Sequence, residues 1–440
     1  MNDKEISKRI KNRERKIRYT AITSILAKIL SMLIPLVTVR YALNYLGAEI
    51  YGLWNTVLSF FSMFAFADLG LGSGLQTTLS QAQGRDDMEE SRRLVSSTYV
   101  ILVISSTIIV IIILGIYGMI DWKSLMNVQS DVASQLVGKV VLIIVLSKLI
   151  NIPFSLVNRT QLALQEGYRG NIWQCFANMI SILLIIVVVK WDIGKVSLIV
   201  VSTYAIVLVS ILNFIVYFRV QRKELAPALK YADRKTAKRM LKIGVAFCLL
   251  SVFTNIGLSL DSFIVAKVSS LEEAATYSII YRATGLISVG CGMLSAPLWG
   301  AFGEALERKD YFWVKERCKK TAVVSLAISM AGTVFLLVFG RLLFAIWLGK
   351  SIAYSNSMLF GMCMTQCLLS FIAPYFMILN ARGIVIKQIA VFCVYTVISV
   401  FLKFVAGGII GIQLIPIIGA ICYGLIVVPF VHIEGKRQIK

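Results

Sequence analysis

Long apolar runs are the feature that most constrains the fold of this 440-residue chain. A transmembrane helix needs about 20 consecutive, mostly apolar residues. Segments such as Ile101–Tyr117 and Ile180–Val189 leave no reasonable alternative to a membrane span. Windows of this size predict twelve spans: 20–43, 51–78, 95–119, 136–158, 171–189, 196–217, 241–265, 276–302, 319–340, 354–380, 387–406 and 412–432. We therefore predict an all-α integral membrane protein of twelve transmembrane helices.

The composition excludes the other common classes of protein. Hydrophobic residues make up 58% of the chain and charged residues 15%, whereas soluble domains have about 45–50% and about 25%. A chain with this much apolar surface does not stay disordered in water. The formal charge of +22 would suggest nucleic-acid binding, but so little polar surface fits that function poorly.

The positions of the cations set the predicted orientation. With the N-terminus on the cytoplasmic side, 33 of the 45 Lys and Arg residues lie in inner segments, eight at outer ends or loops, and four inside spans. Cytoplasmic loops of membrane proteins carry an excess of Lys and Arg. We therefore expect both termini to be cytoplasmic.

The loops divide the predicted spans into two equal halves. We expect a basic cytoplasmic N-terminus, two six-helix bundles joined by a basic cytoplasmic linker, and a cytoplasmic tail, with limits at 1–19, 20–217, 218–240, 241–432 and 433–440. Two halves of equal orientation are typical of parallel-repeat transporters. A weak internal match between Ile50-Tyr51-Gly52 and Thr276-Tyr277-Ser278 agrees with such a repeat.

Proline and glycine inside the spans are candidate hinges. Pro153 and the cluster of Gly70, Gly72 and Gly74 are the strongest of these candidates. Such residues allow helices to bend and backbones to approach closely, as alternating access requires. Ordinary membrane composition, which is rich in both residue types, explains them equally well.

Two patches resemble a known family. The stretch Arg40–Gly84 reads RYALNYLGAEIYGLWNTVLSFFSMFAFADLGLGSGLQTTLSQAQG, with the elements LG-x3-YGLW, DLGLGSGL and LSQAQG. It resembles the Wzx-type polysaccharide and O-antigen flippases of the multidrug/oligosaccharidyl-lipid/polysaccharide (MOP) exporter superfamily. The segments Asp261–Val265 and Ala275–Arg282 are similar to the seventh and eighth spans of that family.

The resemblance implies a fold and a function. It implies a MATE/MOP-like fold with two helical bundles around a central cavity, in the bacterial cytoplasmic (inner) membrane. It also implies alternating-access translocation of an undecaprenyl-diphosphate-linked oligosaccharide, such as an O-antigen or capsule unit, from the inner to the outer leaflet. The expected partners are this lipid-linked oligosaccharide, membrane lipids and other polysaccharide-assembly proteins, with no nucleic acid and no cofactor.

Four cations at membrane depth are candidate substrate-binding residues: Lys28, Lys148, Arg282 and Lys403. Charges inside a membrane are costly, and they commonly mark a substrate path. A diphosphate headgroup is anionic and would need such cations in a water-filled cavity. Snorkelling to the interface is the alternative, and it suits Lys28 and Lys403 because both lie near the ends of spans.

Two acids, Asp68 and Asp261, also lie at membrane depth. Each can pair with a cation or cap a helix end, or it can serve as a proton or sodium site. Structural pairing is the favoured interpretation. We expect no metal site: Cys363 and Cys367 share a helix face, but no His or acidic partner is near them, which favours packing.

Two other functions compete with a flippase. A polymerase, ligase or glycosyltransferase usually needs a sizeable outer loop and exposed acids, whereas the predicted outer loops are short and poor in acids. We therefore expect a transporter rather than an enzyme. A multidrug cation exporter would need deep carboxylates, but the deep charges are four cations and two acids.

Overall fold

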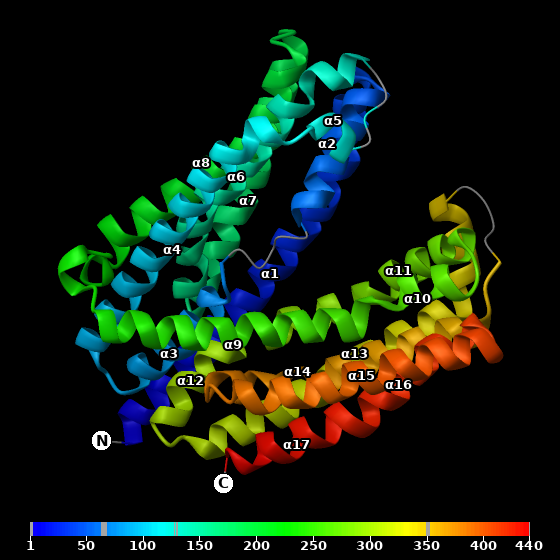
Figure 1. The fold of residues 1–440 in the computed structure, drawn as a ribbon. Coiled ribbons are helices and arrows are strands. Elements are labelled where there is room, and N and C mark those ends of the chain that lie inside the picture. Colours follow the sequence, from blue (N-terminus) through cyan, green and yellow to red (C-terminus); the bar gives the residue numbers. More distant parts are fainter. Residues whose placement is uncertain (1–2, 63–67, 127, 129–130, 349–352, 440) are drawn as a thin grey trace. The chain divides into compact units, whose positions relative to one another are not determined.

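The computed structural model describes the whole chain except residues 1–2, 63–67, 127, 129–130, 349–352 and 440. The described elements are helices, and they form two compact units, Met1–Gly244 and Val245–Lys440. The first unit contains eight α-helices and the start of α9: α1 Asp3–Leu46, α2 Ala48–Ser62, α3 Leu71–Gly84, α4 Met88–Ile116, α5 Trp122–Leu125, α6 Asp131–Ala163, α7 Gly167–Lys190 and α8 Lys195–Val216 (Figure 1).

The second unit begins inside α9, Arg234–Ser259. Each unit contains a described π-helical turn, Tyr217–Gln221 after α8 in the first unit and Tyr423–Val427 between α16 and α17 in the second. The other helices of the second unit are α10 Asp261–Val268, α11 Leu271–Ser295, α12 Leu298–Glu307, α13 Tyr311–Leu348, α14 Asn356–Ala381, α15 Val385–Ile409, α16 Ile415–Cys422 and α17 Val428–Arg437.

Within the described residues, ten segments are long and apolar enough to cross a membrane, and they correspond to the third to twelfth predicted spans. The first predicted span, 20–43, lies inside α1, although the side chains of residues 32–40 are outside the described part. The second, 51–78, covers parts of α2 and α3 and also includes residues 63–67, which are not described. The all-α membrane fold predicted from the apolar runs is confirmed.

Apolar side chains cover the outside of these helices. On α4, for example, Ile104, Ile108, Ile111 and Ile112 are all at least half exposed. Water would penalise such a surface, whereas lipid tails solvate it. The exposed isoleucines therefore belong to the lipid-facing side of a membrane helix.

Three predicted spans are broken rather than continuous. The second span turns at Asp68–Gly70, where Leu69 and Gly70 have left-handed φ angles of 52° and 68°. The seventh breaks at Leu260, between α9 and α10, and the eighth breaks at 296–297, between α11 and α12. Pro297 contributes to the last break because proline removes a backbone donor and clashes with the preceding turn. The breaks free backbone groups that other side chains must satisfy.

A buried carboxylate joins two turns of the first unit. Glu166, between α6 and α7, is 3% exposed and pairs with Arg222 and Arg169. The hydroxyl of Tyr217 donates to the same carboxylate at 3.1 Å. These contacts attach the segment that follows α8 to the turn between α6 and α7.

Candidate functional site

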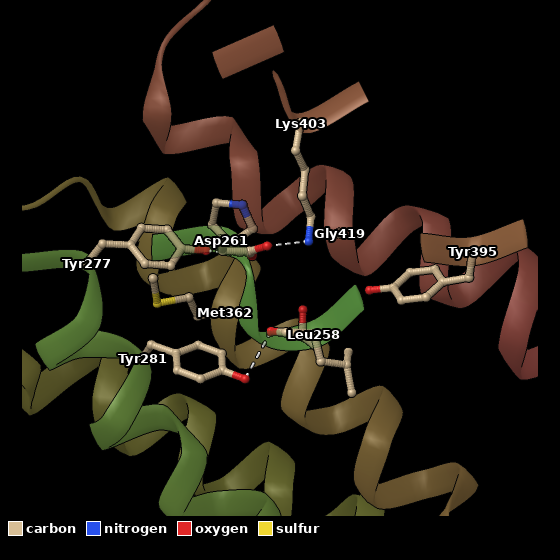
Figure 2. A pocket seen from close by; sticks show the side chains of 10 residues that line it. Leu258, Asp261, Tyr277, Tyr281, Met362, Tyr395, Lys403 and Gly419 are labelled. Carbon is tan, nitrogen blue, oxygen red and sulfur yellow. Dashed lines mark hydrogen bonds and ion pairs between the residues drawn. The ribbon is translucent and has the colours of Figure 1, made fainter. Parts of the chain in front are cut away.

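The second unit contains a buried ion pair between two residues that the sequence singles out. The ammonium of Lys403 on α15 lies 2.5 Å from Oδ1 of Asp261, the first residue of α10 (Figure 2). Lys403 is 1% exposed and Asp261 is 7% exposed. Snorkelling therefore does not describe Lys403, because its ammonium points into the unit and not toward an interface.

Tyrosines surround this pair and donate hydrogen bonds to Asp261 and to the adjacent end of α9. Tyr277 on α11 donates to Oδ2 of Asp261 at 2.8 Å. Tyr281, one turn further along α11, donates to the carbonyl of Leu258 at 3.1 Å, and Tyr395 on α15 donates to the carbonyl of Gly257 at 3.2 Å. These two carbonyls belong to the last turn of α9, where a helix has no backbone donors of its own to offer them.

The space around the ion pair is small. The cavity between its lining residues has a volume of about 10 Å³, enough for about one water molecule. Gly419 on α16 closes one side, because a Cβ atom there would lie 2.8 Å from Cε of Lys403. The space can hold about one water molecule, but it cannot hold a lipid-linked glycan.

A second acid–cation pair lies at the break of the second span, in the first unit. Asp68 accepts a hydrogen bond from the backbone of Gly70 at 3.0 Å and interacts electrostatically with Arg159 of α6. The same arginine donates to Gln76 of α3 at 3.3 Å. The sequence places Arg159 in an inner segment, but α6 continues to Ala163 and turns this side chain back toward α3.

The candidate hinge residues have different surroundings. Gly72 is enclosed, because a Cβ atom there would lie 3.0 Å from Cγ of Arg159 and 3.1 Å from the Asp68 carboxylate. Gly74 is similarly close to Ile243 of α9, at 3.2 Å, and Gly70 has the left-handed conformation that favours glycine. Pro153 is buried inside α6, which remains one helix.

The remaining three deep cations have no ion-pair partner within the described residues. Lys148 on α6 and Arg282 on α11 are exposed, and Lys28 on α1 is half-buried. The structure thus separates the four predicted cations into one that is buried and paired, Lys403, and three that are accessible.

Sequence reasoning missed several residues of the buried site. Tyr277 and Tyr281 are part of the family-like patch, but nothing in the patch marks them as partners of Asp261. Their spacing of four residues places both on one face of α11, which is the only local signal. Tyr395 and Gly257 carry no such signal, because their roles depend on where α9 ends.

The arrangement of helices is that of a known class of transporter. A MATE transporter of known structure aligns with 97% of this chain and 96% of its own, with a TM-score of 0.82 and 17% identity. A MATE transporter of Vibrio cholerae aligns with 97% of this chain and 98% of its own, with a TM-score of 0.81 and 13% identity. A MOP superfamily transporter of Pyrococcus furiosus aligns with 97% of this chain and 96% of its own, with a TM-score of 0.79 and 15% identity. The chain is a multi-pass membrane protein with the MATE/MOP transporter fold.

Sequence comparison then gives the family. The pattern of the family described as polysaccharide biosynthesis protein matches residues 19–297. A curated Yersinia pseudotuberculosis protein assigned to O-antigen export is 22% identical over 320 residues, which is 71% of each chain. The chain belongs to the polysaccharide biosynthesis protein family, and the predicted resemblance to polysaccharide exporters is confirmed.

Proposed function

We propose that this protein is a flippase for an undecaprenyl-diphosphate-linked oligosaccharide. In this proposal it moves the lipid-linked unit from the inner to the outer leaflet by alternating access and makes no covalent change to it. The observation that carries the proposal is the presence of exposed cations at the predicted membrane depth, Lys148 and Arg282, with no ion-pair partner among the residues that the structure describes, in a chain of a polysaccharide biosynthesis family.

The position of Lys148 supports a path for an anion. One face of α6 carries polar side chains at intervals of three or four residues: Lys148, Asn151, Ser155 and Arg159. Residues at this spacing share one side of a helix. Lys148 and Arg159 are about 16 Å apart along the axis, at about 1.5 Å per residue. A polar stripe of this kind lines a hydrated cavity at lower cost than it would face lipid.

Arg282 suits the terminal contact with a diphosphate. Its guanidinium can bind two phosphate oxygens at once, whereas the Lys148 ammonium acts as a point charge. Arg282 is exposed on α11 beside small and apolar residues, such as Ala275 and Leu286, that also face outward. Such a helix face offers one strong anion contact on an otherwise apolar wall.

The deep acids argue against a multidrug cation exporter. A cationic drug needs a carboxylate that is free to bind it, but Asp261 is paired with Lys403 and Asp68 lies beside Arg159. Asp261 is therefore already neutralised, and Asp68 lies in the field of a cation. The accessible deep charge of the described residues is positive, which favours an anionic cargo.

The proposal includes an orientation. With both termini in the cytoplasm, the basic segment 218–240 is an inner linker, and Glu166 with its two arginines lies on the same side. The host membrane is then the bacterial cytoplasmic membrane, where lipid-linked units are assembled on the inner face. Other polysaccharide-assembly proteins would receive the unit on the outer face.

The test replaces the two accessible cations in cells that lack the native chain. Lys148→Ala and Arg282→Ala should insert normally but stop surface-glycan production and leave short lipid-linked units in the membrane. Lys148→Arg keeps the charge and should retain export. Lys139→Ala is the matched control, because it removes another exposed lysine from α6, nearer the helix start.

The same cells distinguish the competing functions. Single glycan units displayed on the outer surface would indicate a polymerase. A normal surface glycan with altered drug susceptibility would indicate a multidrug exporter. Full complementation by both alanine variants would refute the role of these two cations in binding the cargo.

A further inference from the structure

The end of α9 forms a site with the features of a monovalent-cation site. The carbonyls of its last turn accept hydrogen bonds from side chains beside the Asp261 carboxylate: Gly257 accepts from Lys403, and Leu258 accepts from Tyr281 (Figure 2 shows the latter). The C-terminus of a helix carries a partial negative charge, and half-helix ends with carboxylates coordinate small cations in membrane transporters. The group that occupies this position here is the Lys403 ammonium.

The contacts of Lys403 are those that a bound cation would make. Its Nζ donates to Oδ1 of Asp261 at 2.5 Å and to the carbonyl oxygen of Gly257 at 3.4 Å. The other oxygen of Asp261 accepts from Tyr277, and the Gly257 carbonyl also accepts from Tyr395. The ammonium thus completes a small set of oxygen ligands from α9 and α10.

The packing leaves little space beside the ammonium. Nζ of Lys403 would lie 3.0 Å from a Cβ atom on Gly419, so the backbone of α16 lies directly against the ammonium. The cavity volume of about 10 Å³ admits about one water molecule. A free cation at this carboxylate would have to compete with the Lys403 ammonium, which is 1% exposed and already holds Oδ1 of Asp261.

We propose that Lys403 is the permanent, covalently attached occupant of a monovalent-cation site formed by Asp261 and the end of α9. It neutralises Asp261 and excludes sodium, potassium and other free cations from this carboxylate. Lys403 is then the residue that determines ion specificity in the second unit, which does not take up a free cation at this position. This inference does not depend on the identity of the exported molecule.

The experiment empties the site and offers it a replacement. Lys403→Ala removes the atoms of a propylammonium ion. Its melting temperature in detergent should be well below that of the wild type, and propylammonium chloride should raise it saturably and recover most of the loss. Ligands that bind only the folded state stabilise it in this way. Sodium or methylammonium should recover part of the loss, and tetramethylammonium, which is too large, should recover none.

Two controls separate a cation site from a general salt effect. Lys387→Ala removes an ammonium that lies 2.9 Å from Glu434, on a lysine side chain that is about half exposed. Propylammonium should not affect the melting temperature of this variant. The double variant Asp261→Asn with Lys403→Ala lacks the carboxylate and should lose the response. An equal response of Lys403→Ala to propylammonium and tetramethylammonium would overturn the proposal.

The wild-type protein gives an independent test that does not need a stable Lys403→Ala variant. At constant ionic strength, its melting temperature should be the same in lithium, sodium, potassium and choline chloride. A shift specific to one small cation, removed by Asp261→Asn, would show that free ions reach this carboxylate and would overturn the proposal.

Discussion

Replacing one member of the Lys403–Asp261 pair should cost far more stability than replacing both. In Lys403→Met the side-chain volume is nearly kept, but the buried Asp261 carboxylate keeps only the Tyr277 hydroxyl as a described donor. In Asp261→Asn the ammonium, 1% exposed, loses its opposite charge and keeps only neutral acceptors among the described contacts, the amide oxygen and the Gly257 carbonyl at 3.4 Å. Removing one partner of a buried pair costs about 3–5 kcal/mol, because it leaves an uncompensated charge.

The double variant removes both charges and leaves none unpaired. Asparagine fills nearly the volume of aspartate, and methionine nearly that of lysine. Replacing a buried ion pair by neutral groups of similar volume often changes the stability little. We expect a total loss of about 2 kcal/mol or less, well below the sum of the two single losses. The difference is the interaction energy of the pair.

The assay is a double-mutant cycle on the full chain in detergent. Thermal or denaturant unfolding of the wild type, the two single variants and the double variant is compared at one scan rate, because membrane proteins unfold irreversibly under many conditions. Additive losses, with the double variant the least stable of the four proteins, would refute the account of this site as a coupled buried pair.

Three further predictions concern other parts of the structure. Gly419→Ala should lose about 1–3 kcal/mol of stability through overpacking against Lys403, whereas Gly424→Ala should be tolerated, since its nearest contact would be 3.6 Å away; melting temperatures compare them. Glu166→Gln leaves its two arginine partners without a buried carboxylate and should speed tryptic cleavage of the segment after α8. Backbone and then side-chain hydrogen bonds from the start of α9 lower the pKa of Asp233 below its usual 3.8. Its charged form therefore stabilises the fold above pH 3.8, and the stability advantage of the wild type over Asp233→Asn should vanish as the pH falls through the lowered pKa.

The class of fold could be predicted because the membrane imposes a simple requirement. Each span needs a long apolar run, and runs such as Ile101–Tyr117 satisfy it without reference to the rest of the chain. The breaks within spans are different. The turn at Leu260 is tolerated because Tyr281 and Tyr395, from two other helices, satisfy carbonyls at the end of α9. No local pattern in the sequence reports such distant partners.

The candidate sites could be predicted as single residues but not as pairs. Lys403 and Asp261 are both unusual at membrane depth, yet they are 142 residues apart and only helix packing brings them together. Arg159 follows an apolar run and therefore reads as an inner-loop cation, although α6 extends far enough to place it beside Asp68. Depth along a span can be estimated from sequence, whereas the direction of a side chain around a helix depends on its neighbours.

The most direct test of the proposed flippase is the leaflet distribution of the lipid-linked oligosaccharide in cells with and without this chain. Sealed right-side-out membrane vesicles from these cells would be treated with periodate, which oxidises sugar diols and does not cross the membrane. With the native chain present, a large fraction of the lipid-linked sugar should be oxidised. Without it, or with Lys148→Ala and Arg282→Ala combined, nearly all of the sugar should be protected until the vesicles are opened. Equal oxidation with and without the chain would contradict the account.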